Sequence, residues 1–304
     1  MAYTGDVHRY IEFTQGVKFD LQQKESKLMP LVTEVTNGGK MEMHDFLGEV
    51  GNFDDITGRH ANTKLTEVEH KRRAITCKPK AKTFLIDDED KARQAHDINS
   101  LYIKDATMAY NRTIDAMIYS GLNASVAAGE DGTTLVARPT TYDVAHDSGY
   151  DTDGIWVASG ATSVGLTIDK LRRAKLMLDE QYADELGEYC MVVHPRQLDN
   201  MLGLVEVTSS DYAAVKALVR GEVDSFMGFK FISYNDVSLA AGIYDCYAVT
   251  KGSMYLASQK STGGLRTEIS RRADKNNATQ IQLKFDKGVA RMFDEAVIKI
   301  ECKG

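Results

Sequence analysis

The chain has 304 residues, which is the length of about two domains. Hydrophobic residues make up 43% and charged residues 27%, so a buried core is expected and global disorder is excluded. The 37 basic and 44 acidic side chains give a net charge of −7, which argues against a protein that grips DNA over its whole surface.

Residues 1–50 form a first region that is weakly periodic, with several glycines and a polar stretch before Pro30. This pattern predicts an extended arm with a short helix and not a compact domain. Apolar side chains such as Phe13, Phe19 and Leu31 need a surface to cover them. That surface is either the chain's own body or a neighbouring subunit.

Residues 59–86 form a second, strongly basic region. Two runs of strand-forming residues, Thr66–Ile75 and Lys80–Ile86, predict a hairpin that reaches into solvent, because neither face is apolar enough to pack on a core. A solvated charged loop is the alternative. A nucleic-acid patch is disfavoured, because no aromatic residue is interleaved with the charges before Phe84. This region has a net charge of +6, because it holds two acidic residues, Glu67 and Glu69, and eight basic ones. The basic residues are Arg59, Lys64, Lys71, Arg72, Arg73, Lys78, Lys80 and Lys82.

Residues 88–120 are predicted to form a long helix. Three acidic residues from Asp88 to Asp90 complement the dipole of its first turn, and Gly121 is expected to end it. Residues that recur every three or four positions form a stripe along this helix, and most of their side chains are small, which favours close packing against a sheet. Its members are Ala95, Ile98, Tyr102, Ala106, Ala109, Thr113 and Ala116.

Residues 123–165 are predicted to be loop and short strand, and residues 166–250 a compact α/β unit. Thr167 is a suitable N-cap for the first helix of that unit, and no dinucleotide-binding fingerprint is present. The expected elements are a helix through Leu171 and Leu178, a strand Cys190–Val193, a helix Pro195–Leu202, a helix from Ser209 or Ser210 to Gly221, and strands Phe229–Ser233 and Tyr244–Val249.

Residues 253–302 alternate between apolar and polar side chains, which predicts one final sheet. The long helix and this sheet are expected to form one domain, with the α/β unit inserted into it. The expected strands are Met254–Ser258, Leu265–Arg271, Thr279–Phe285, Val289–Phe293 and Val297–Cys302.

No catalytic or cofactor-binding constellation is recognisable, so no cofactor and no metal are expected. The four cysteines form no CxxC pair, the histidines lack metal-ligand spacing, and no signal peptide or membrane span is indicated. His194 joins a strand end to a helix start, where sites occur, but a cap or packing role is the simpler interpretation. The pairs Arg271–Arg272 and Asp294–Glu295 are expected to be solvated or to form ion pairs between subunits.

The arm and the hairpin indicate an assembly. Ordering a residue costs about 1–2 kcal/mol of backbone entropy, and burial on a neighbour recovers roughly 25 cal/mol per Å². Extensions of this kind therefore favour a lattice of subunits. Deleting residues 60–80 is expected to leave a foldable core but to abolish large particles.

Several stretches in this order resemble the major capsid proteins of tailed bacteriophages, which have the Hong Kong 97-type fold. The basic stretch EVEHKRRAITCKPKAKTFLIDDEDKARQAHDINSLY resembles that family's E-loop leading into its spine helix. YCMVVHPRQLDNML and DYAAVKALVRGEVDSFMGFKFISYNDV resemble the A-domain core. LRTEISRRADKNNATQIQLKFDKGVARMFDEAVIKIEC resembles the P-domain sheet.

The resemblance implies an α+β fold with four parts: an N-terminal arm (1–55), an E-loop hairpin (56–86), a P-domain (87–165 and 251–304) and an inserted A-domain (166–250). It implies copies in hexamers and pentamers that enclose double-stranded DNA by weak non-specific contact. The basic E-loop residues and Arg271, Arg272, Asp294 and Glu295 would then lie between subunits. A separate scaffolding protein, a portal and a decoration protein are the other partners implied, with assembly in the host cytoplasm and no membrane.

Two alternatives are open. One is an encapsulin-type nanocompartment, which uses the same fold around a protein cargo. The other is an α/β enzyme that acts through His194.

Overall fold

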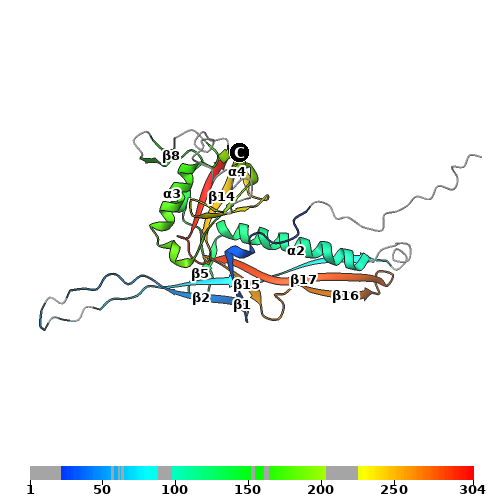
Figure 1. The fold of residues 1–304 in the computed structure, drawn as a ribbon. Coiled ribbons are helices and arrows are strands. Elements are labelled where there is room, and N and C mark those ends of the chain that lie inside the picture. Colours follow the sequence, from blue (N-terminus) through cyan, green and yellow to red (C-terminus); the bar gives the residue numbers. More distant parts are fainter. Residues whose placement is uncertain are drawn as a thin grey trace, which may run out of the picture.

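The computed structural model describes residues 22–55, 58–60, 62, 65–87, 98–151, 155–160, 164–202 and 225–304. Figure 1 shows a helix lying along a long flat sheet and a second sheet standing above one end of that helix. A two-stranded ribbon leaves the body on the side of this upright sheet, away from the other end of the helix (Figure 1). The expected helix from Ser209 or Ser210 to Gly221 lies outside the described residues.

The flat sheet joins segments that are far apart in the sequence. β17 lies at its centre, with β4 antiparallel along one edge and β16 and β15 antiparallel along the other. β1 extends the sheet by pairing in parallel with β15. Its strands are β1 (Val32–Asn37), β4 (Lys78–Ile86), β15 (Met254–Gln259), β16 (Arg266–Arg272) and β17 (Ala278–Arg291).

β17 is a single strand of 14 residues, where two strands with a turn between them were expected. Asp286 and Lys287 continue the pairing with β4, so no turn forms there. Gly288 marks a close approach instead: an added Cβ would overlap the carbonyl oxygen of Thr76, where the chain crosses β17 on its way into β4.

The long helix α2 (Ile98–Asn123) packs on the flat sheet, as expected, but two details differ. Gly121 does not end the helix; a Cβ there would press on Val289, so the glycine lets helix and strand come close. Ala106 of the small-residue stripe is buried against the flat sheet, but Ala109 and Thr113 are only partly buried and Ala116 is exposed. The other buried apolar positions lie outside that stripe: Met108, Ile114, Ile118 and Leu122. Asp88 to Asp90 and Ala95 lie outside the described residues.

The ribbon is formed by β2 and β3, which pair from Met41↔Thr76 out to Leu47↔His70. The expected hairpin between the two basic runs is therefore wrong, because β4 pairs with β17 and not with β3. The base of β3 is also not purely polar, since Ala74 and Ile75 are buried. The sheet consists of β2 (Met41–Leu47), β3 (His70–Thr76), β5 (Val126–Ala128) and β6 (Thr134–Val136).

The upright sheet has seven strands and is covered by α3, whose N-cap Thr167 accepts a hydrogen bond from the backbone N–H of Lys170 as expected. The last strand, β18, pairs with β14 in this sheet and not with β15, β16 or β17, the strands that it was expected to join. The strands are β7 (Asp143–Val144), β10 (Tyr189–Val193), β11 (Ser225–Phe226), β12 (Phe229–Ser233), β13 (Leu239–Ala240), β14 (Ile243–Thr250) and β18 (Val297–Lys303).

The remaining described elements are short connections and two helices of the upright part. They are α3 (Ile168–Asp179), α4 (Pro195–Leu202), the strand pair β8 (Gly149–Tyr150) and β9 (Trp156–Val157), and 3-10 turns at Met29–Leu31, Thr140–Tyr142 and Ala183–Leu186.

One hydrophobic cluster crosses the boundary between the two sheets. Ile114, Ile118 and Leu122 of α2 belong to the same buried cluster as the upright sheet, and so does Met254 of β15. The helix is therefore shared by both layers, and the upright part does not have a core of its own.

Replacing Gly288 with alanine is expected to lower the free energy of unfolding by about 1–3 kcal/mol, because the new methyl group displaces the backbone at Thr76. Urea unfolding followed by circular dichroism measures the change. Gly264→Ala is the matched control, since a methyl group there meets open space. Equal stabilities of the two variants would contradict the close crossing.

Candidate functional site

The base of the ribbon is held to the body by a buried cluster of three charged side chains. Both guanidinium groups of this cluster point at Asp294: Arg73 donates through Nη1 (3.2 Å) and Nη2 (2.6 Å), and Arg291 through Nε (2.6 Å). Arg291 is completely buried and also donates from Nη1 to the carbonyl oxygens of Leu122 and Ala124, at 2.8 and 3.1 Å. One cluster therefore joins β3, the end of α2 and the turn between β17 and β18.

Electrostatics favour the charged form of this carboxylate. Burial by itself would raise the pKa of Asp294, but the hydrogen bonds from Arg73 and Arg291 and their positive charges lower it below its usual value of 3.8. Arg73 and Asp294, both expected between subunits, thus satisfy each other within one chain.

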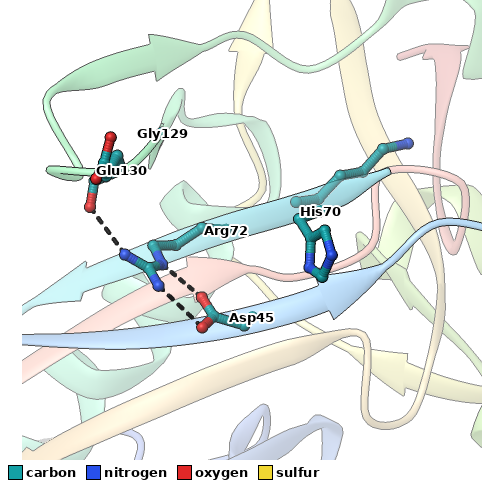
Figure 2. Close-up of a pocket in the computed structure, with 6 residues that line it drawn as sticks. Asp45, His70, Arg72, Gly129 and Glu130 are labelled. Carbon is teal, nitrogen blue, oxygen red and sulfur yellow. Dashed lines mark hydrogen bonds and ion pairs between the residues drawn. The ribbon is translucent and has the colours of Figure 1, made fainter. Parts of the chain in front are cut away.

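Figure 2 shows the outer side of the same ribbon base. Arg72 of β3 pairs with Asp45 across the ribbon, with 3.0 Å between Nη2 and Oδ2, and donates to the carbonyl oxygen of Glu130 at 3.0 Å. The Arg72 hydrogen bond lowers the pKa of Asp45. A hollow of about 380 Å³ lies here, but its side chains are exposed and screened by water, so it is a weak candidate for a binding site.

Four of the remaining predicted basic residues lie on the two edges of the flat sheet. Lys78, Lys80 and Lys82 alternate along β4, are exposed, and form no ion pair with a described residue. Arg272 of β16 pairs with Asp274 on the other edge of the sheet, at 2.7 Å between Nε and Oδ1. The other four are Arg59, exposed near the ribbon end, Lys64, outside the described residues, Lys71, which pairs with Glu69 at 3.4 Å, and Arg271, exposed on β16.

Glu295 is exposed and lines a hollow of about 550 Å³ at the ribbon base, together with Asp294, Phe46 and Phe293. Its neighbour Asp294 points inward, so the expected acidic pair is divided between surface and core.

His194 has a structural role. Its Nδ1 accepts a hydrogen bond from the backbone N–H of Arg196 at 3.2 Å, in the first turn of α4, and its ring stacks on Tyr244 at 4.5 Å. Burial and the charge of Arg196 lower the pKa of His194, which favours the neutral acceptor. Capping and stacking account for this residue without a reaction.

Sequence analysis missed a second anchor, the buried carboxylate of Asp115 on α2. It accepts hydrogen bonds from the backbone N–H groups of Lys27 (2.9 Å) and Leu28 (3.1 Å), and from the side chains of Gln23 and Ser26. Residues 22–28 are thereby strapped along the helix. An aspartate inside a helical stripe looks solvated in a sequence, since its partners are 87 or more residues away.

No described helix has both the length and the apolar character that a membrane crossing requires. Among the described residues there is also no cluster of three or more metal-binding side chains.

A family of sequences described as "Phage capsid protein" matches residues 8–304. The chain belongs to this phage capsid protein family. No curated protein sequence matches the chain.

Solved capsid structures show the same fold. The capsid of Ralstonia phage GP4 matches with a TM-score of 0.75 at 12% identity, covering 100% of this chain and 97% of that one. The cyanophage Pam1 capsid matches with 0.70 at 13% identity, covering 99% and 98%. The capsid of a native GTA particle matches with 0.63 at 14% identity, covering 100% and 98%. The α+β fold of the Hong Kong 97 type is thus confirmed.

The phage capsid protein is a structural subunit that assembles with many copies of itself into the shell of a virion. Neither alternative, the encapsulin-type compartment or the enzyme acting through His194, receives support from the family or from these structures.

Replacing Asp294 with alanine is expected to destabilise the subunit by about 3–5 kcal/mol, because it leaves the buried Arg291 without its counter-ion. Thermal unfolding of the unassembled subunit measures this. Asp274→Ala, which breaks the exposed pair with Arg272, is the control and is expected to leave the midpoint unchanged.

Acid is expected to weaken the subunit through the same carboxylate. Because the pKa of Asp294 is lower in the folded chain than in the unfolded one, its contribution is complete above about pH 4 and is lost as the pH falls through the folded value. Unfolding measured from pH 7 to pH 2 checks this. A wild-type profile no steeper than that of Asp294→Asn would contradict it.

Replacing Asp115 with alanine is expected to release the strap, because the buried backbone N–H of Leu28 and the partly buried one of Lys27 lose their acceptor, at about 1–3 kcal/mol for the buried group. Limited proteolysis is expected to cut near residues 22–28 faster. Asp105→Ala, which removes only the bond from Gln22, serves for comparison. Unchanged cleavage in the Asp115 variant would refute the anchoring role.

Proposed function

We propose that the chain is the major subunit of an icosahedral phage head, in which hexamers and pentamers enclose double-stranded DNA. The GTA particle that this chain resembles was described with C5 symmetry, which is the symmetry of a five-fold vertex in such a shell. A ring of identical subunits needs a contact between two different surfaces of the same chain.

The ribbon is the observation that carries this proposal. A two-stranded hairpin is marginally stable in water by itself. The base of this one packs on the body through Phe46 and Phe293, but its outer part extends past the body (Figure 1). Its outer part also exposes large apolar side chains: Leu47 by 70%, Val50 by 55%, Phe53 by 106% and Leu65 by 93%. Such side chains are expected to be covered by a neighbouring subunit.

The four-part division fits this role: arm (1–55), E-loop (56–86), P-domain (87–165 and 251–304) and A-domain (166–250). The pairing of β2 with β3 supports a different boundary for the E-loop. The extension is then the ribbon from Met41 to Thr76, and β4 belongs to the P-domain sheet.

We propose inter-subunit roles for the exposed members of the predicted set, with Lys78, Lys80 and Lys82 on one edge of the sheet and Arg271 and Arg272 on the other. Glu295 is accessible for the same role. Arg73 and Asp294 are better explained as the joint inside each subunit.

Other partners follow from the proposed role. A separate scaffolding protein, a portal and a decoration protein would complete the particle, which would be built in the cytoplasm of a bacterial host. The net charge of −7 supports weak and non-specific contact with packaged DNA, because a strongly basic wall would hold every phosphate it met.

Expressed alone or with its scaffold, the chain is expected to form closed particles. Analytical sedimentation and electron microscopy measure this, and the particle content distinguishes DNA from a protein cargo. A chain that stays monomeric under all conditions would refute the shell function.

Shortening the ribbon is expected to abolish particles while the subunit still folds. The deletion of residues 60–80 is unsuitable, because it removes β3 with Ile75 and Arg73. Replacing residues 49–68 with Asn-Gly keeps the paired strands and removes only the outer part. Normal circular dichroism with at least about a tenfold loss of particles is expected; normal particle yield would contradict the role of the ribbon.

A further inference from the structure

One lysine of the flat sheet is buried without a negative partner. Lys287 of β17 is only 5% exposed and forms no ion pair with a described residue. Its ammonium group lies 5.8 Å from the centre of the Tyr110 ring on α2, which is a weak contact for a full charge. A buried charge without a counter-ion is unfavourable, so this side chain indicates a partner that the described chain does not supply.

The neighbouring strand adds like charge at the same place. Lys287 stands directly opposite Lys78 of β4 in the antiparallel ladder, so the two side chains share one face of the sheet. Like charges in directly opposed positions repel each other. Lys80 lies two positions further along β4 and therefore on the same face. Three lysines are thus gathered on the side of the sheet along which α2 lies (Figure 1).

All three lysines line one hollow between the helix and the sheet. Its volume is about 430 Å³, within the range of about 300–1,000 Å³ that is usual for small-molecule sites. Lys78 and Lys80 are exposed at its rim, whereas Lys287 is buried in its wall. No acidic residue lines this lysine hollow.

The rest of the lining suits an anion but does not neutralise the lysines. Thr76 and Ser125 contribute hydroxyl groups, which can donate hydrogen bonds to the oxygen atoms of a bound anion. The last carbonyl groups of α2 are engaged elsewhere, since those of Leu122 and Ala124 accept hydrogen bonds from Arg291. Among the residues that the structure describes, the lysine hollow therefore lacks a negative charge.

We propose that the lysine hollow is a binding site for a small phosphate-bearing anion of about the size and charge of pyrophosphate. Lys287 holds the anion from the inner wall, and Lys78 and Lys80 hold it from the rim, each as a point charge on phosphate oxygens. One phosphate monoester carries about −1.5 to −2 charges at pH 7, so two linked phosphates match three lysines better than one. The backbone of duplex DNA reaches only the exposed lysines, because Lys287 is buried.

The site lies within one chain, so it does not depend on the proposed shell function. A bound anion removes the repulsion between Lys78 and Lys287 and links β4 to the central strand of the flat sheet. A ligand that binds only the folded chain stabilises it by mass action. The supply of a phosphate compound then determines how much folded subunit is available, while the exposed ends of Lys78 and Lys80 stay accessible to a neighbour.

Binding of sodium pyrophosphate to the purified, unassembled subunit tests the site. Isothermal titration calorimetry at constant ionic strength measures the affinity, and the midpoint of thermal unfolding is expected to rise with pyrophosphate concentration. Lys287→Met removes the charge, keeps an unbranched side chain, and is expected to weaken binding at least about tenfold. Lys284→Met is the matched control: it lies on the same strand but on the opposite face, and it keeps the wild-type affinity.

Stability without the ligand provides a second readout. In the absence of pyrophosphate, Lys287→Met is expected to unfold at the wild-type temperature or above it, because it removes a buried charge that repels Lys78. A lower midpoint would reveal a partner inside the chain and overturn the proposal. Lys78→Gln with Lys80→Gln changes only exposed side chains and is expected to weaken binding about tenfold, with an unchanged circular dichroism spectrum.

Two comparison ligands define the anion. Inorganic phosphate is expected to bind more weakly than pyrophosphate, and a short DNA duplex is expected to bind Lys287→Met as it binds the wild-type subunit. A duplex whose binding falls with Lys287→Met would assign the three lysines to DNA and refute the small-anion site. Wild-type subunits that do not bind pyrophosphate, or a Lys287→Met variant that binds it equally well, would also refute it. None of these measurements uses particles, so their outcome is independent of whether the chain forms a shell.

Discussion

One buried carboxylate determines how the parts of this subunit are arranged. Asp294 is the place where the base of the ribbon, the end of the long helix and the turn into the last strand meet, through Arg73 and Arg291. Separating the partners of a buried ion pair leaves an uncompensated charge, so the three elements have little freedom to rotate about this cluster. A shell of many copies needs extensions that leave each subunit in the same direction, and this cluster supplies that constraint.

The second general feature is the sharing of one core by both sheets. α2 gives Ile114, Ile118 and Leu122 to the cluster of the upright sheet and Ala106 to the cluster on the flat sheet. Movement of one layer alone would therefore break contacts of the other. The body of the subunit is therefore stiff, and changes of shape are left to the segments that have few contacts with it. The ribbon is held at its base through Asp294 and extends beyond that point, whereas residues 22–28 are held along α2 by Asp115.

Local signals in the sequence predicted most elements but not their partners. The Thr167 cap, the strand before His194 and the helix beginning at Pro195 depend on residues within a few positions of each other, and all three were confirmed. Alternation cannot tell which sheet a strand joins, which is why β4 and β18 were assigned to the wrong neighbours. Gly121 was interpreted as a helix stop, and the strand break expected before Val289 includes Gly288, whereas both glycines are points where two segments touch. The charge count of the sequence identified the exposed basic residues. It could not predict the pairing of Arg73 with Asp294, which are 221 positions apart.

The parallel pairing of β1 with β15 also affects how the chain reaches this structure. β1 ends at Asn37 and β15 begins at Met254, so the strand near the start of the chain completes the sheet only after the segments between them have been placed. Pairings of such high sequence separation form slowly, because loop entropy is lost before contacts compensate for it. Until β1 arrives, β15 has an unpaired edge, which another chain can pair with. We therefore expect the order of folding, and not only the final stability, to decide how many chains reach a shell instead of an aggregate.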